Sequence, residues 1–198
     1  MIATKTELVN AVASYTHRND LLSIIPQFID IVTKRLGREL QSQANEKTID
    51  FVMTQNPEFL PTDYAVIRKL VYPAAAGDVF ITPMPMRYVS NISGQSSNGQ
   101  PMYYNVTAKM ITVLPTALST YSLTYYAEPT ALIADSDTND VLLAYPDLYL
   151  YAALSEAFFY IQDGEMGQAS KAKYKEELRA INLVNTQSQA GAVPAMRR

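Results

Sequence analysis

The chain contains no cysteine and only one histidine among its 198 residues. Without cysteine it cannot form a disulfide scaffold, a Cys-based zinc site or a thiol nucleophile. The single histidine, His17, cannot build a multi-His metal centre within one chain. Disulfide-rich domains, zinc fingers and thiol enzymes are therefore excluded as classes.

Long apolar runs are also absent. No run approaches the roughly 18 consecutive apolar residues that a transmembrane helix needs. The N-terminal sequence MIATKTELVN lacks the apolar core of a signal peptide. We therefore expect a protein that is made and retained in the cytosol unless another route packages it, and one without a membrane partner.

Charged residues are scarce, at 18% of the chain, where about 25% is typical of globular domains. Neutral polar residues replace them, with 16 Thr, 13 Ser, 10 Asn and 10 Gln, and there are 14 tyrosines. A surface that is poor in charge and rich in Tyr and Met is typical of proteins that bury much of it against other proteins. The composition therefore favours an oligomeric interaction protein over a disordered chain.

The charges are also unevenly distributed. Residues 110–170 contain eight acids and neither Lys nor Arg, whereas residues 171–198 contain six bases and two acids. An acidic body argues against tight wrapping of DNA, which requires many cations on phosphates. A basic C-terminal segment favours head-to-tail contact between copies or docking on an acidic partner.

Helical patterns occupy both ends of the chain. Thr4 and Glu7 form a capping box that opens a helix through Tyr15. Asn19 and Asp20 are expected to cap a longer helix that ends near Gln43. On that helix Lys34, Arg35 and Arg38 lie opposite the apolar stripe, where they form either a solvated face or a partner-facing basic stripe.

The last third of the chain is helical again. Pro146 begins a helix that runs to about Ile161 and is apolar on all sides, so it must be buried. A final helix is predicted from about Glu165 to Gln187, with an apolar stripe through Tyr174, Leu178 and Ile181.

The middle of the chain alternates with a period of two, which is typical of strands. Pro83 and Pro85 break one segment, and residues 91–100 read as a flexible loop. A tight turn is expected at residues 107–109. The predicted strands are 48–53, 64–72, 102–106, 110–114 and 121–127.

These patterns predict an α+β fold: a helical bundle from N- and C-terminal helices with an inserted small antiparallel β lobe. The helices cover about 4–43 and 141–187, and the β lobe about 48–127. We expect one domain over residues 1–188, followed by a flexible tail over 189–198 that is too poor in apolar residues to fold alone.

Two carboxylates are the best candidates for catalysis. Glu156 lies in the apolar helix and Asp163 follows it, so a glycosidase-like acid–base pair is conceivable. The alternative is that Glu156 forms an ion pair with an arginine in the core or in an adjacent subunit. We favour the ion pair, and we expect no catalytic residue in the chain.

Two other clusters suggest chemistry less strongly. His17 could form a hydrolytic cluster with Asn19 and Asp20, but no Gly-x-Ser-x-Gly nucleophile motif accompanies it. Residues 135–140 resemble the first half of a calcium loop, but Asp140 replaces the required Gly and Pro146 the required Glu. A polar linker that caps the helix after Asn139 is the favoured interpretation. No glycine-rich phosphate loop occurs, so no cofactor and no metal are expected.

A series of segments, taken in order, resembles the head-to-tail adaptor (connector) proteins of bacteriophages with short tails. The similarity extends from about residue 21 to about residue 187. The segments that carry it are RLGREL at 35–40, LPTDY at 60–64, IRKL at 67–70, GQPMYY at 99–104, ITVLP at 111–115, YSLTYY at 121–126 and YPDLYLYAALSEA at 145–157.

The resemblance implies a structural virion protein without catalysis of its own. Such proteins form rings, usually of twelve copies, between the portal and the tail, and DNA passes through the ring without specific binding. The implied partners are copies of the same chain, the portal protein and tail proteins, and the implied location is the neck or tail region of a virion made in the host cytoplasm. A phage-associated hydrolase using Glu156 and Asp163, or a generic oligomeric binding module, are the alternatives.

The C-terminal tail is the predicted contact with a partner. It ends in a flexible hydrophobe and two guanidinium groups, which can order on a partner that offers a small pocket and carboxylates. The residues expected to make this contact are Val193, Met196, Arg197 and Arg198.

Overall fold

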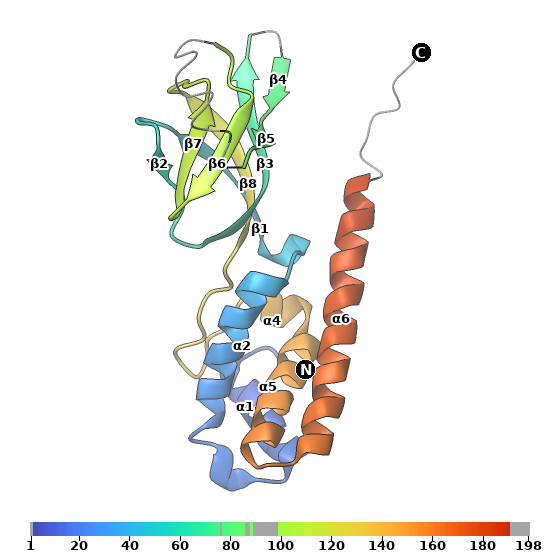
Figure 1. Ribbon diagram of the computed structural model, residues 1–198. Coiled ribbons are helices and arrows are strands. Elements are labelled where there is room, and N and C mark those ends of the chain that lie inside the picture. Colours follow the sequence, from blue (N-terminus) through green and yellow to red (C-terminus); the bar gives the residue numbers. More distant parts are fainter. Residues whose placement is uncertain (1, 76, 86–87, 89–98, 191–198) are drawn as a thin grey trace. The chain divides into compact units, whose positions relative to one another are not determined.

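The computed structural model describes residues 2–75, 77–85, 88 and 99–190 (Figure 1). Contacts divide the chain into two compact units. The helical unit comprises Met1–Asn45 and Glu128–Arg198, and the β unit comprises Glu46–Ala127. The β unit is thus inserted in the sequence between the two halves of the helical unit.

Helix α5 is the centre of the helical unit, where it contacts α1, α2, α4 and α6 (Figure 1). Its buried residues include Leu148, Tyr149 and Leu154, so the prediction that this all-apolar helix is buried is confirmed. The elements of the unit are α1 (Lys5–Thr16), η1 (Asn19–Leu21), α2 (Ile25–Glu39), η2 (Gln43–Asn45), α4 (Asp140–Ala144), α5 (Pro146–Tyr160) and α6 (Gly164–Ala190).

The first helix begins as its capping box predicts. The Thr4 side chain accepts a hydrogen bond from the Glu7 amide at 3.3 Å. The stripe predicted for the last helix is also confirmed, because Tyr174 is buried and Leu178 and Ile181 contact the same core.

The single long helix expected between Asn19 and Gln43 is wrong. The chain instead forms the short turn η1 and then α2, which starts at Ile25 with Pro26 in its first turn. Proline lacks an amide hydrogen and its ring clashes with the carbonyl four residues earlier, so a helix cannot run through Pro26 and begins there instead.

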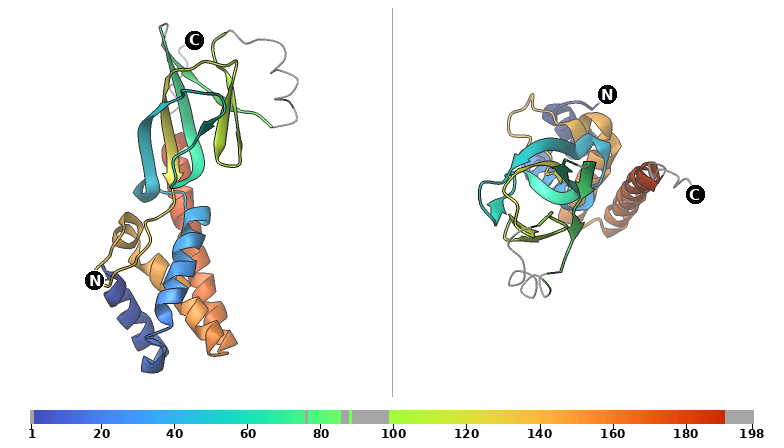
Figure 2. Two further views of the ribbon diagram at one scale, coloured as in Figure 1. Left: turned by 90° about the vertical axis from the view of Figure 1, so that its left-hand side faces the viewer. Right: turned by 90° about the horizontal axis from the view of Figure 1, so that it is seen from above.

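The β unit consists of two four-stranded sheets. One has the order β1–β8–β3–β4, and Figure 2 (left) shows β8 in yellow within it. The other has the order β2–β7–β6–β5. The strands are β1 (Glu46–Val52), β2 (Glu58–Phe59), β3 (Tyr64–Ala74), β4 (Gly77–Phe80), β5 (Thr82–Pro83), β6 (Tyr103–Thr107), β7 (Met110–Leu114) and β8 (Thr120–Ala127).

Both sheets contribute side chains to one hydrophobic core. On β8, Tyr121, Leu123 and Tyr125 alternate into it, and on β7 Ile111 and Val113 do the same. Side chains of a strand point alternately to opposite faces, so one face of each sheet supplies this core.

The predicted architecture, a helical bundle with a small antiparallel lobe, is wrong. The β part is an extensive body of eight strands in two sheets, and five α-helices occur in the described part of the chain. One strand pair is parallel: Thr82–Pro83 lies beside Tyr103–Tyr104. Pro83, expected to break the segment, is tolerated because β5 is an edge strand, where a missing amide costs no ladder bond.

A two-residue turn joins β6 to β7, as the sequence predicts. Ala108 and Lys109 both adopt left-handed backbone conformations, with φ of 52° and 60°. This is the geometry of a type I′ hairpin turn, which normally carries Asn and Gly because other residues are strained there. The predicted loop at 91–100 lies, apart from Gly99 and Gln100, outside the described residues.

Candidate functional site

The two candidate catalytic carboxylates have separate structural partners. Glu156 on α5 accepts a hydrogen bond from Arg35 on α2, with 2.6 Å between Oε1 and Nη2. Both side chains are about a quarter exposed, at 26% and 23%. The favoured ion pair of Glu156 with an arginine is therefore confirmed. Arg35 is partly buried by this pair, whereas Lys34 and Arg38 are exposed.

Asp163 immediately precedes helix α6. Its Oδ1 accepts the Met166 amide at 3.1 Å, and its carbonyl accepts the Gly167 amide at 3.0 Å. A carboxylate in this position satisfies amides that have no partner within the helix and complements the helix dipole. Helix geometry thus explains Asp163 without a reacting group.

The segment resembling a calcium loop is a polar linker. Asp137 Oδ2 accepts the amides of Ile133 and Ala134 at 2.8 and 2.7 Å. Asn139 caps α4 by accepting the Leu142 amide at 2.8 Å, which confirms the favoured interpretation. Within residues 2–75, 77–85, 88 and 99–190, no group of three or more His, Asp or Glu side chains could hold a metal ion.

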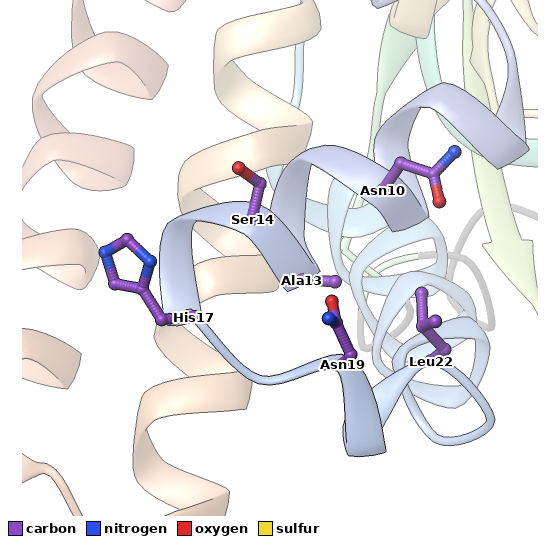
Figure 3. A pocket seen from close by; sticks show the side chains of 6 residues that line it. All are labelled: Asn10, Ala13, Ser14, His17, Asn19 and Leu22. Carbon is purple, nitrogen blue, oxygen red and sulfur yellow. The ribbon is translucent and has the colours of Figure 1, made fainter.

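His17 lines an open hollow of about 490 Å³, shown in Figure 3. Its other lining residues are neutral: Asn10, Ala13, Ser14, Asn19 and Leu22. The His17 imidazole points away from Asn10 and Leu22, so the side chains do not converge on one reacting position.

The capping role predicted for Asn19 and Asp20 is wrong. Arg18 is the N-cap of η1 and makes no side-chain cap. Its guanidinium instead donates two hydrogen bonds of 2.7 Å to Asp20, and these hold the pKa of the Asp20 carboxyl below its ordinary value. Asp20 is thus paired with Arg18, and it does not orient His17 as a general base.

The β unit carries a polar cluster on neighbouring strands. Lys47 Nζ donates to Asp63 Oδ2 at 2.6 Å, and the Tyr125 hydroxyl donates to Asp63 Oδ1 at 3.0 Å. Partial burial favours the neutral form of Asp63, but these hydrogen bonds outweigh it and lower the pKa of its carboxyl. Burial, then the hydrogen bond to Asp63 and its charge, raise the pKa of Tyr125 to about 12. Arg68 and Glu46 form a second ion pair.

Large apolar side chains are exposed on both units. A contiguous apolar surface usually marks a contact with another protein, whereas isolated exposed residues need no explanation. The most exposed on the helical unit are Ile133 (80%), Val184 (66%), Tyr15 (59%), Leu183 (58%) and Leu143 (55%). Those on the β unit are Phe80 (66%), Phe59 (63%), Leu118 (59%), Val52 (57%) and Met102 (54%).

Sequence reasoning did not single out these surface residues, although a signal existed for one of them. Leu183 is nine residues from Tyr174, which at 100° per residue places it on the opposite side of the helix. An apolar residue opposite a buried stripe indicates a second contact. The predicted contact residues Val193, Met196, Arg197 and Arg198 lie outside the described residues.

The charged groups singled out above are paired within the chain, and large apolar side chains are exposed on both units. The family model described as SU10 adaptor protein matches residues 3–198, so this chain belongs to the SU10 adaptor protein family. No curated protein matches the chain. The resemblance to phage head-to-tail adaptors is confirmed, and the match also covers the first helix and the C-terminal tail, which that resemblance left out.

Membership makes the protein a structural adaptor of a bacteriophage particle, a class that is not typically enzymatic. An adaptor assembles with other subunits and with portal and tail components of the virion. Among the helices of the described residues, none combines the length and the apolar character needed to cross a bilayer.

Proposed function

We propose that the chain is a subunit of the head-to-tail adaptor ring in the virion neck, between the portal protein and the tail. The observation that carries the proposal is the family match over residues 3–198. In this proposal twelve copies form the ring and tail proteins attach to it. Residues 1–188 act as one adaptor domain, and 189–198 as its tail.

The exposed apolar side chains support an assembled role. Ile133 and Val184 on the helical unit and Phe80 on the β unit are exposed to 80%, 66% and 66% in a single chain. Contact with other subunits removes such groups from water, at a gain of roughly 25 cal/mol per Å² of apolar surface. A ring supplies this contact through heterologous interfaces, in which each copy uses two different surfaces.

The charge distribution supports a role as a conduit for DNA. The net charge is −3, and residues 110–170 contain neither Lys nor Arg. Phosphate contacts from cations dominate the affinity of proteins for DNA. A ring of such subunits therefore lets DNA pass during ejection without gripping it.

Light scattering after size-exclusion chromatography tests the proposal, on the purified chain with and without portal protein. We expect a closed oligomer of twelve copies, either alone or on the portal. A chain that stays monomeric with portal present contradicts the proposal. An oligomer that never binds portal supports the generic binding module instead.

We propose further that the tail anchors the ring to the portal through Val193, Met196, Arg197 and Arg198. Deletion of residues 189–198 should leave the melting temperature nearly unchanged, because no core is removed. It should weaken portal attachment. If the arginines dominate, high salt should reduce the difference in portal binding between the full chain and the truncated chain, because salt already screens the charge of the arginines. Unaltered portal binding by the truncated chain at low and high salt rejects the anchor.

A further inference from the structure

We propose that α6 of one copy docks on the acidic segment of the next copy in the ring. The α6 ridge consists of Lys175, Arg179 and Leu183, and the acidic segment consists of the exposed side chains within residues 133–147. This inference rests on the proposed function, because it names the interface through which ring subunits meet.

The α6 ridge follows from the helical repeat. Residues 175, 179 and 183 are four apart, so their side chains form one row along the helix. The inner side of α6 is fixed by Tyr174, which is buried, and whose hydroxyl donates to Glu39 Oε2 at 2.8 Å. Leu183 lies opposite Tyr174 and is 58% exposed.

The ridge offers both charge and apolar surface. Lys175 and Arg179 are exposed and border an open hollow of about 410 Å³, together with Ala172 and Glu176. Within the part of the chain that the structure describes, neither cation has a carboxylate within ion-pair distance. Val184, the next residue after Leu183, is 66% exposed and adds apolar surface at this end of α6.

The acidic segment offers the complementary surface. Its apolar side chains are Ile133 (80% exposed) and Leu143 (55% exposed). Its exposed acids are Asp135, Asp140 and Asp147. Lys5 Nζ donates to the Ile133 carbonyl at 2.7 Å. Residues 133–147 themselves contain four Asp and neither Lys nor Arg, so the segment is negative.

The segment is also well held in place. Amides of Lys5 and Thr6 donate to the carbonyls of Asp137 and Asp135 at 2.9 and 3.1 Å. The cap of α4 by Asn139 fixes its other end. A docking surface with few conformations to lose binds at a lower entropic cost.

A second copy of the chain is the occupant that these observations favour. The α6 ridge is basic and apolar, and the acidic segment is acidic and apolar. In Figures 1 and 2, α6 and the coil before α4 lie on different sides of α5, so the two segments of one copy can contact different neighbours. Such a contact between two different surfaces repeats from copy to copy, and it closes into a ring when the rotation between successive copies divides a full turn. The apolar side chains contribute affinity, and the charges select the register.

Two charge-reversal variants test the contact. The ridge variant is Lys175→Glu with Arg179→Glu, and the segment variant is Asp140→Lys with Asp147→Lys. All four residues are exposed, so both proteins should fold with a wild-type circular dichroism spectrum. A matched control reverses Lys34 and Arg38, two exposed cations on α2 of the same unit.

Each variant alone should associate at least about tenfold more weakly than the wild type, because attraction becomes repulsion. A 1:1 mixture of the two should restore the ring, since each reversed ridge meets a reversed segment and each native ridge a native one. The control should assemble as the wild type does. Assembly of either variant alone at wild-type strength overturns the inference, as does a mixture that stays dissociated.

Cross-linking gives an independent test, which the absence of native cysteine makes clean. Leu183→Cys with Leu143→Cys, joined by a short bismaleimide in assembled particles, should give a ladder of oligomers. A pairing of Tyr15→Cys with Leu143→Cys is the control and should give none. Equal ladders from both pairs overturn the inference.

The outcomes also separate this inference from the proposed function. If the wild type never assembles, with or without portal, the proposed function fails. If the wild type forms its ring and the mixture does not restore it, only this interface fails. If the ridge variant keeps its self-association but loses portal, the occupant of the ridge is the portal protein, which overturns the inference.

Discussion

The helical unit and the β unit differ in how their polar contacts connect the chain. In the helical unit the contacts join the sequence before the β unit to the sequence after it: Arg35 to Glu156, Glu39 to Tyr174, and Thr33 to Tyr149. In the β unit the contacts Lys47–Asp63, Tyr125–Asp63 and Arg68–Glu46 join residues that all lie within Glu46–Ala127. The helical unit therefore depends on both ends of the chain, whereas the β unit is self-contained.

The largest expected effect comes from opening a cavity in each core. Leu142 in the helical unit and Leu123 in the β unit are fully buried. Either substitution to Ala should cost about 2–5 kcal/mol in the free energy of unfolding. If the units are separate cooperative bodies, hydrogen exchange should accelerate mainly in the unit that carries the substitution. Equal acceleration in both units by both variants would contradict the comparison.

Removal of the Glu156 charge should have the next largest effect on stability. Glu156→Gln leaves the half-buried Arg35 without its carboxylate, at a cost of about 1–3 kcal/mol in a urea titration. Asp20→Asn, which breaks the exposed pair with Arg18, is the control and should leave the urea midpoint unchanged. The proposed adaptor role involves no hydrolysis. Loss of a hydrolytic activity in Glu156→Gln at unchanged stability would support the hydrolase alternative instead.

Alkaline pH should weaken the β unit. Burial, followed by the neighbouring Tyr72, raises the pKa of Tyr121 to about 12, and the pKa of Tyr125 is raised to about 12 by its burial and by Asp63. The unfolded chain releases these protons near pH 10, so the stabilisation is complete below pH 10 and is lost as pH rises to about 12.

Thermal unfolding at pH 9, 10 and 11 checks this expectation. The melting temperature of the wild type should fall above pH 10. That of Tyr125→Phe should fall less steeply, because one of the titrating groups is gone. If the melting temperature falls equally steeply with pH in wild type and Tyr125→Phe, groups other than Tyr125 cause the loss of stability at alkaline pH.

The smallest expected effect concerns the turn between β6 and β7. Lys109→Gly should stabilise the β unit by about 0.5–1 kcal/mol, because glycine adopts the observed φ of 60° without strain. Lys109→Ala is the matched control and should not stabilise, since alanine keeps the steric cost. A gain with Ala as large as that with Gly would show that the lysine side chain, and not the backbone, is the cause.

The features that could be predicted from the sequence are those that a few adjacent residues determine. The Thr4 capping box, the burial of the apolar helix after Pro146 and the turn at 107–109 each depend on a few adjacent residues, and the structure agrees with all three. The start of α2 beside Pro26 could have been predicted in the same way, because proline excludes a continuous helix there.

Pairings between distant residues could not be read in the same way. The parallel contact of β5 with β6 joins residues 82–83 to 103–104, and no periodicity specifies a strand's partner. For the candidate site, the pattern indicated that Glu156 needs a cation, but it did not select Arg35 on another helix. Helix geometry places Leu183 opposite the buried Tyr174, so an exposed apolar side chain could have been predicted there. The surface that we propose it contacts could not, because the fold assembles that surface.

The insertion of the β unit between the two halves of the helical unit sets an order of events during synthesis. The ribosome delivers Glu46–Ala127 as one uninterrupted stretch, but α1 and α2 must wait for α5 before their apolar sides are covered. At about 5–20 residues per second, that wait lasts roughly 5–20 s. We expect the β unit to resist protease on ribosome-bound chains that are just long enough for residue 127 to have left the exit tunnel, while α1 and α2 are still cut because α5 has not yet emerged. During that interval, nascent copies on one messenger RNA expose the same two helices side by side.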